Sequence, residues 1–405
     1  MVDTKIESSP RQTPKNPRSR RRRLLRTLTT LGVLGALSVG GILWSQGAFW
    51  APVQLDQKIA GTFTVAGSAP VLPWPTQGQA YIAVEGVGML GSSGPADSPA
   101  PIASVTKTMT AYQVLQDHPL GATEDGPTIQ ITQPLFNAAR SKDGDESGIE
   151  LQVGEQLTLR QALEGMLLPS AGNMARLLAT WDAGSVQAFV GRMNAQARTL
   201  GMSHTTYADP AGIDSNSKST AADQVKLGEK VLENPTLAGI VSLKAAKVPV
   251  AGTVTNTNRL LGLDGDIGIK TGSTSAAGGC LLFAVHTTVS GVPVTLVGAV
   301  LGQPGQPWSI LDHATTASKS LIEAAEHSLV VTTVAHSGST VAVLRQRGHA
   351  DVALTSANDV SVVGWPSLTY KVLVTPENSV DVYSLSVNSA QSPNASAVSS
   401  RLSGS

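Results

Sequence analysis

A stretch without charged residues runs from residue 28 to residue 50, directly after the arginines Arg18, Arg20, Arg21, Arg22, Arg23 and Arg26. At ~1.5 Å per residue, a helix of this length spans a hydrocarbon core of roughly 30 Å. The arginines favour the cytoplasmic side, and Trp44, Phe49 and Trp50 suit an aromatic belt at the far interface. We therefore expect a basic cytoplasmic tail at 1–27 and a single-pass transmembrane anchor at 28–50, with the rest of the chain extracytoplasmic in a cell-membrane protein.

A cleaved signal peptide is the alternative for this segment. Its hydrophobic region is usually shorter, about 7 to 15 residues, although small residues at 45–48 would suit cleavage. Either interpretation places the rest of the chain outside the cytoplasm.

The composition of the 405 residues is that of a globular protein, with 41% hydrophobic and 14% charged residues. The formal net charge is zero, so the charge balance gives no indication of a nucleic-acid partner. The single cysteine, Cys280, stands in an apolar run, where a buried structural residue is expected. The histidines are scattered without a close ligand pair, and we expect neither a metal nor another cofactor.

Composition and periodicity divide the remaining chain. Residues 51–77 resemble a linker, and 78–328 combine an early strand at 80–84 with helices and three late strands at 266–273, 279–288 and 292–301. Helices are predicted from residue 102 and at 158–168, 173–181, 185–200, 220–233 and 309–327. Short valine-rich runs indicate a β-rich module at 329–387, and the Ser, Ala and Asn-rich residues 388–405 predict a disordered tail.

Two Ser-x-x-Lys tetrads occur, Ser104-Val-Thr-Lys107 and Ser215-Asn-Ser-Lys218. Residues at i and i+3 share a helix face, so the lysine amine can take the proton of the serine hydroxyl. Ser104 opens an apolar-periodic helix, whereas Ser215 lies in a polar loop. Context therefore favours Ser104 as the nucleophile and Lys107 as its base.

The only Lys-Thr-Gly sequence is Lys270-Thr271-Gly272, in a strand-like stretch followed by Ser273. Lys270 and Gly272 point the same way in such a strand, which places a cation beside a gap where a substrate backbone can approach. Lys270 is also expected to depress the pKa of Lys107 through like-charge repulsion. An exposed strand lysine before a turn glycine is the structural alternative.

Ser170 closes an apolar run between these motifs. A loop there could present its hydroxyl to the site, and a helix cap is the alternative role.

In order and approximate spacing, these three motifs resemble those of the D-alanyl-D-alanine carboxypeptidases, the low-molecular-mass penicillin-binding proteins. The phrases Gly148 to Glu155, Leu200 to Tyr207 and Asp209 to Asp214 are similar to that family as well. The resemblance covers about 78–326. It implies an α+β fold of the penicillin-binding and β-lactamase type, an antiparallel sheet with a helical subdomain, here followed by a small C-terminal β-rich module.

The resemblance also implies a reaction. Ser104 would be acylated by a peptidoglycan stem peptide with loss of its terminal D-Ala, and β-lactam antibiotics would inhibit it covalently. Lys107 would act as base and Ser170 as proton relay. Lys270 and Thr271 would bind the substrate carboxylate in the strand that Gly272 opens, and the N–H groups of Ser104 and Ser273 would form the oxyanion hole.

The chain departs from the family's Ser-x-Asn pattern, because Gly172 stands where the asparagine belongs. Asn173 follows one residue later, rotated by about 100° on a helical turn, so it is a doubtful replacement. We expect loss of the asparagine contact to weaken the enzyme. A catalytically weak penicillin-binding wall protein therefore stays open as an alternative. A serine β-lactamase, which shares the fold and the motif order, is the other.

Overall fold

The computed structural model describes residues 53–140, 146–306, 309–376, 383–389, 391 and 396–404. The predicted anchor at 28–50 lies outside these residues. Within the described part of the chain, no helix is both long and apolar enough to cross a membrane.

An antiparallel five-stranded sheet forms the centre of the larger of two compact units, which comprises residues 57–343 and 353–405. Its order is β11-β12-β13-β3-β4. The strands are β3 (Gln79–Val84), β4 (Gly88–Ser93), β11 (Asp266–Thr274), β12 (Gly278–Val289) and β13 (Val292–Gln303). The predicted early strand and three late strands thus join in one sheet.

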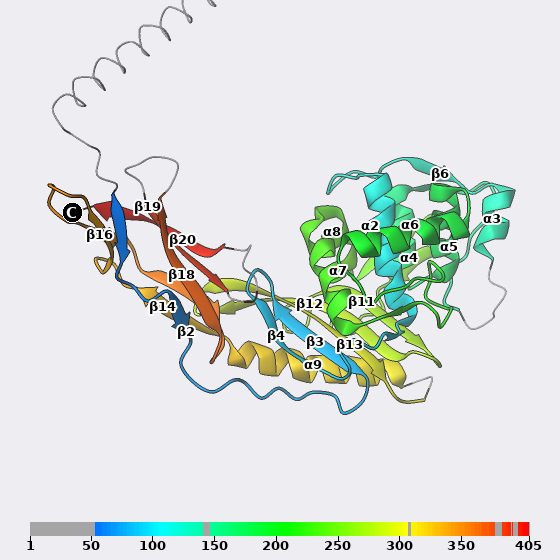
Figure 1. Ribbon diagram of the computed structural model, residues 1–405. Coiled ribbons are helices and arrows are strands. Elements are labelled where there is room, and N and C mark those ends of the chain that lie inside the picture. The colour runs from blue at the N-terminus through cyan, green and yellow to red at the C-terminus, as the bar shows by residue number, and fades with distance from the viewer. Residues whose placement is uncertain are drawn as a thin grey trace, which may run out of the picture. The chain divides into compact units, whose positions relative to one another are not determined.

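Helices cover both faces of this sheet (Figure 1). Side chains alternate along β12, so Cys280, Leu282 and Ala284 join the core beneath the helical subdomain. On the other face, Gly279 lies under α9 (Ile310–Ser328), where a Cβ at that glycine would stand 1.9 Å from the Ile310 carbonyl oxygen. Burial on both faces explains why this strand is apolar without interruption from Cys280 to Val285.

The helical subdomain contains the predicted helices other than α9, and two that were not predicted, α3 and α8. Its members are the 3₁₀-helix η1 (Ala103–Thr106), α2 (Lys107–Asp117), α3 (Gln133–Ala139), α4 (Leu159–Leu167), α5 (Gly172–Ala183), α6 (Val186–Thr199), α7 (Ala221–Glu233) and α8 (Pro235–Val241). Short strand pairs join its loops: β5 (Ala100–Pro101) with β8 (Lys218–Ser219), β6 (Thr128–Gln130) with β7 (Gln156–Thr158), and β9 (Ala245–Val248) with β10 (Gly252–Thr255).

The predicted β-rich region follows α9. It contains β14 (Val330–Ala335), β15 (Thr340–Arg345), β16 (Val352–Ser356), β17 (Val360–Gly364), β18 (Thr369–Pro376) and β19 (Tyr383–Ser389). β14 pairs with β17, and β18 pairs with β19. In the smaller unit, Arg345 forms ion pairs with Asp56 at 3.3 Å and Asp351 at 3.2 Å.

Two predictions made from composition were wrong in part. The predicted linker contains β1 (Gln54–Gln57) and β2 (Thr62–Thr64), and β2 pairs with β18. The predicted disordered tail contains β20 (Ser396–Gly404), which pairs with β16 and β19. In both cases partner strands from elsewhere in the chain complete hydrogen bonds that the local composition does not indicate.

Candidate active site

The first tetrad lies at the junction of η1 and α2. A 3₁₀-helix has three residues per turn, so the side chains at i and i+3 are aligned. Lys107 Nζ donates a hydrogen bond of 2.7 Å to Ser104 Oγ. Lys107 is fully buried and Ser104 is 9% exposed. If the amine is neutral, the same contact lets it accept the hydroxyl proton as Ser104 attacks.

A loop after α6 holds the other side of Lys107, whose Nζ donates to the Ala211 carbonyl at 2.9 Å. Asp209 fixes this loop by accepting from the N–H groups of Gly212 and Ile213, each at 2.9 Å. Gly212 has φ 78°, and a Cβ there would stand 1.8 Å from the carbonyl oxygen of the residue before Ser104. The phrase 209–214, which had no assigned role, therefore positions the lysine.

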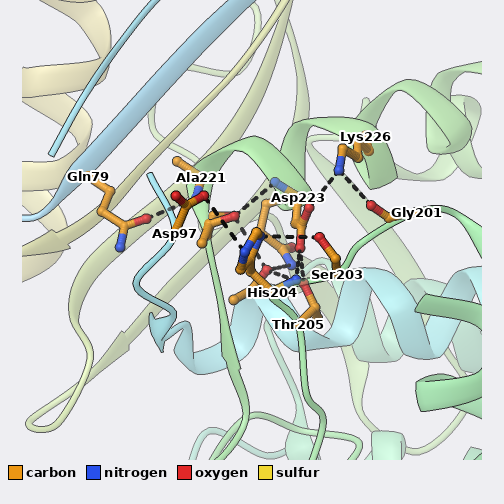
Figure 2. Close-up of polar contacts among 12 residues, drawn as sticks. Gln79, Asp97, Gly201, Ser203, His204, Thr205, Ala221, Asp223 and Lys226 are labelled. Carbon is orange, nitrogen blue, oxygen red and sulfur yellow. Dashed lines mark hydrogen bonds and ion pairs between the residues drawn. The ribbon is translucent and has the colours of Figure 1, made fainter. Parts of the chain in front are cut away.

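The ends of this loop are fixed by the buried Asp223 at the start of α7 (Figure 2). Asp223 accepts from His204 N at 2.8 Å and from Thr205 Oγ1 at 2.9 Å. Thr205 Oγ1 also lies 2.7 Å from Ser219 Oγ, and the next residues form the bridge Thr206–Lys218. The 206–218 loop is thus closed at its base.

Burial lowers the pKa of Lys107 to about 8. The Glu146 and Asp209 carboxylates oppose this change, and the Arg176 guanidinium adds to it. A usable fraction of the amine is therefore neutral near pH 7 to 8.

Lys270 and Gly272 lie on β11 beside the tetrad. Lys270 is buried, its Nζ donates to the Thr271 carbonyl at 3.0 Å, and Thr271 Oγ1 lies 2.6 Å from Thr257 Oγ1. A Cβ at Gly272 would stand 2.9 Å from Ser104 N, so the missing side chain lets β11 approach η1. The exposed alternative for Lys270 is therefore wrong. The following Ser273 is exposed, on the segment that this approach brings to the nucleophile.

The pKa of Lys270 lies well below its ordinary value, through burial first and the positive charge of Lys107 second. Burial is the largest cause for both lysines. The expected repulsion acts in the other direction, because the charge of Lys107 lowers the pKa of Lys270, whereas the cation that lowers the pKa of Lys107 is Arg176.

Ser170 lies between α4 and α5 and is 8% exposed, with a left-handed φ of 65°. The N-cap of α5 is Ala171, without a side-chain cap, so the helix-cap interpretation of Ser170 is wrong. A non-glycine residue in this backbone region is held there by its surroundings and occurs often at functional sites.

Asn173 does not take the place of the asparagine absent at position 172. Its Nδ2 donates to the Ile149 carbonyl at 2.7 Å, and its Oδ1 accepts from Ile149 N at 3.2 Å. The place of a side chain at Gly172 is instead occupied by the Glu146 carboxylate, because a Cβ there would stand 1.4 Å from Glu146 Oε1. Sequence reasoning missed Glu146, and the glycine itself was the only signal.

Two other candidates are placed outside the site. Ser215 is exposed in a turn, and Lys218 belongs to β8. Cys280 is fully buried in β12, and burial raises the pKa of its thiol to about 12, as expected of a structural cysteine.

Comparison with known proteins gives one consistent result. Residues 74–305 match the family described as D-alanyl-D-alanine carboxypeptidase. A D-alanyl-D-alanine carboxypeptidase of Streptomyces sp. (strain K15) is 33% identical over 229 residues, 52% of this chain and 76% of that protein. A D-alanyl-D-alanine endopeptidase of Pseudomonas aeruginosa is also 33% identical over 229 residues, 54% of this chain and 70% of that protein.

Solved structures agree with this match. The Streptomyces K15 DD-transpeptidase has a TM-score of 0.53 at 29% identity, covering 65% of this chain and all of that one. Penicillin-binding protein 5 from Haemophilus influenzae has a TM-score of 0.59 at 21% identity, covering 84% of this chain and 98% of its own, which extends the likeness in fold to the β-rich region. The predicted α+β fold is confirmed.

Proposed function

Since the chain belongs to the D-alanyl-D-alanine carboxypeptidase family, we propose that it removes the terminal D-Ala from peptidoglycan stem peptides through an acyl-enzyme on Ser104. The observation that carries this proposal is the 2.7 Å contact between Lys107 Nζ and Ser104 Oγ in a buried site.

The residues divide the chemistry in two steps. Ser104 Oγ attacks the penultimate D-Ala carbonyl while its proton passes to neutral Lys107, and the peptide C–N bond breaks as the leaving amine is protonated with help from Ser170. Water then attacks the ester, and Ser104 regains its proton as the shortened peptide leaves. Lys270 and Thr271 bind the substrate carboxylate, and the N–H groups of Ser104 and Ser273 stabilise the oxyanion.

Release of D-Ala from a diacyl-D-Ala-D-Ala peptide by the purified protein tests this function. We expect release by the natural chain and none by Ser104→Ala. Rapid turnover of a penicillin with no peptide hydrolysis would instead identify a β-lactamase, and acylation without turnover of either would identify a penicillin-binding wall protein.

We further propose that residues 28–50 anchor the chain in the cell membrane, with the catalytic domain outside the cytoplasm. The charge-free length of this segment and the arginines before it support the proposal. Protease added to intact cells should digest the region 150–300, and digestion only after lysis would contradict this topology.

A further inference from the structure

The space beside Gly172 is filled by a side chain from a distant part of the sequence. A Cβ at Gly172 would stand 1.4 Å from Glu146 Oε1 and 2.2 Å from its Cδ. The carboxylate therefore occupies the volume into which a side chain at position 172 would project. Glycine is required here as long as the carboxylate stays in place.

Glu146 is held in this position by the first two turns of α5. Both of its carboxylate oxygens lie near Arg176 Nη1, at 2.8 Å and 2.7 Å. Arg176 is itself fixed by the Ala139 carbonyl, at 3.1 Å from Nε and 2.9 Å from Nη2. The Glu146 side chain is only 4% exposed, so the pair is well shielded from water.

The residues after Glu146 are fastened to the same helix. Gly172 N donates to the Ser147 carbonyl at 2.8 Å, and the Asn173 amide holds both backbone groups of Ile149. Asn173 thus binds the segment that carries Glu146, which explains why its amide is not available to the site.

The second carboxylate oxygen is held by charge rather than by a hydrogen bond. Glu146 Oε2 is buried and accepts no hydrogen bond from the described residues, although it lies within ion-pair distance of Arg176. A carboxylate can only accept hydrogen bonds, whereas an asparagine amide both donates and accepts. The site at position 172 therefore presents an anion where the family pattern presents a neutral amide.

Lys107 interacts electrostatically with four charged groups. Glu146 and Asp209 stabilise its ammonium form, Arg176 opposes it, and Lys270 responds to its charge. Asp209 already accepts from two backbone N–H groups and from the Ser217 hydroxyl. The Glu146 carboxylate is instead paired with the Arg176 guanidinium.

We infer that the Glu146 carboxylate, admitted by Gly172 and held by Arg176, replaces the third side chain of the Ser170 motif and is a positioning residue for Lys107. The inference rests on the proposed function, in which Lys107 takes the proton of Ser104. The sequence alone predicts only that the asparagine contact at position 172 is lost. In the structure the Glu146 carboxylate occupies that place, and its charge controls the protonation of Lys107.

The test is the rate of Ser104 acylation by a fluorescent penicillin across pH 6 to 10, in the full chain. Glu146→Gln keeps the size of the side chain and removes the anion that stabilises the Lys107 ammonium. We expect the acidic limb of the profile to move to lower pH by about one unit, the size typical of a nearby opposite charge. Arg176→Gln removes the cation and should move the limb to higher pH.

Opposite movements of the acidic limb in the two variants indicate an electrostatic effect on Lys107. A merely structural role would lower the acylation rate at every pH without displacing the limb. An unmoved limb in both variants would overturn the inference. Slower release of the penicilloyl group by Glu146→Gln, with an unchanged acylation profile, would also overturn it by placing Glu146 at the hydrolytic water. If the natural chain is not acylated at all, the proposed function fails before the variants are compared.

A second set of variants tests the occupied space. Gly172→Asn should displace the Glu146 carboxylate and reduce acylation about tenfold, the scale of one lost buried hydrogen bond. In a Glu146→Ala background the same substitution has room, so we expect Gly172→Asn to raise acylation there. This reversal of sign between backgrounds is the signature of two side chains competing for one place. An equal effect in both backgrounds would contradict the inference.

Discussion

The two Ser-x-x-Lys tetrads have the same spacing and opposite surroundings. Ser104 and Lys107 lie on successive helical segments, aligned and buried, with their polar atoms 2.7 Å apart. Ser215 lies in an exposed turn, and Lys218 belongs to a short strand. Burial also moves the pKa of Lys107 to about 8, which makes the amine a usable base. Spacing alone does not produce this chemistry.

The second tetrad nevertheless supports the first. Its internal residue Ser217 is 1% exposed and donates to Asp209 Oδ1 at 2.7 Å. Ser217 Oγ also accepts from Ala208 N at 3.0 Å. Because Asp209 fixes the loop that presents the Ala211 carbonyl to Lys107, this polar loop is part of the scaffold of the catalytic lysine.

The largest expected effect is on the nucleophile. Ser104→Ala should abolish covalent labelling by a fluorescent penicillin, because no other described serine has a lysine aligned on its helical segment. Ser215→Ala is the matched control and should label like the natural chain. Peptide mapping that places the adduct on Ser215 would defeat the assignment.

Substitution of the lysine should have a nearly equally large effect on acylation in the first tetrad and little effect in the second. Lys107→Arg keeps a cation, but a guanidinium does not lose its proton in the working pH range, so acylation should fall by on the order of 10²- to 10⁴-fold. Lys218→Arg should change the rate little. Second-order acylation rates check this, and a Lys107→Arg variant that is acylated as fast as the natural chain would show that charge rather than proton transfer is needed.

Local patterns predicted most of the fold and only part of the site. Periodicity located α4, α5, α6, α7 and α9 to within about two residues, because each buries an apolar face. Ser104, Lys107 and Lys270 belong to short sequence motifs that can be recognised without a structure. The Ala211 carbonyl cannot be found in this way, because every residue has one.

Glu146 was missed for a different reason. It lies in a polar stretch and reaches the site only through a contact with a glycine 26 positions later in the chain. The left-handed backbone of Ser170 is likewise set by its surroundings rather than by its residue type. Both features depend on tertiary packing, which no single-sequence pattern contains.

An intermediate effect is expected from Ser217→Ala. Removing this hydroxyl takes one of two donors from Asp209 Oδ1 and leaves the N–H groups of Ala208 and Asp209 without their acceptor, at about 1 to 3 kcal/mol of folding free energy. Acylation should fall several-fold, since the loop that holds Lys107 loosens. Thermal unfolding and acylation rates check this together, and Ser215→Ala, only two positions away, should leave both unchanged. A Ser217→Ala variant with unchanged stability and full activity would show that the 206–218 loop does not depend on Ser217 to hold Lys107.

The smallest effect on acylation is expected at Asp266, which tests whether burial by itself marks a catalytic group. Asp266 begins β11, is 3% exposed, and accepts from Asn258 Nδ2 at 2.9 Å and Gly268 N at 3.1 Å. Burial raises its pKa from 3.8 to about 7, in the direction opposite to that of Lys107. Nothing places it in contact with the catalytic groups, so Asp266→Asn should leave acylation unchanged.

Its effect should appear in stability instead, with a definite dependence on pH. For an acid whose pKa is higher in the folded state, the folded chain binds more protons than the unfolded one between the two pKa values. The stabilising contribution of Asp266 is therefore complete below pH 3.8 and lost as the pH rises to about 7. Asp266→Asn stays neutral, so its melting temperature relative to the natural chain should rise between pH 5 and pH 8, corresponding to about 1 to 3 kcal/mol. A difference that is constant with pH would show that the Asp266 carboxyl is not held protonated by burial, and a fall in acylation would place it in the site after all.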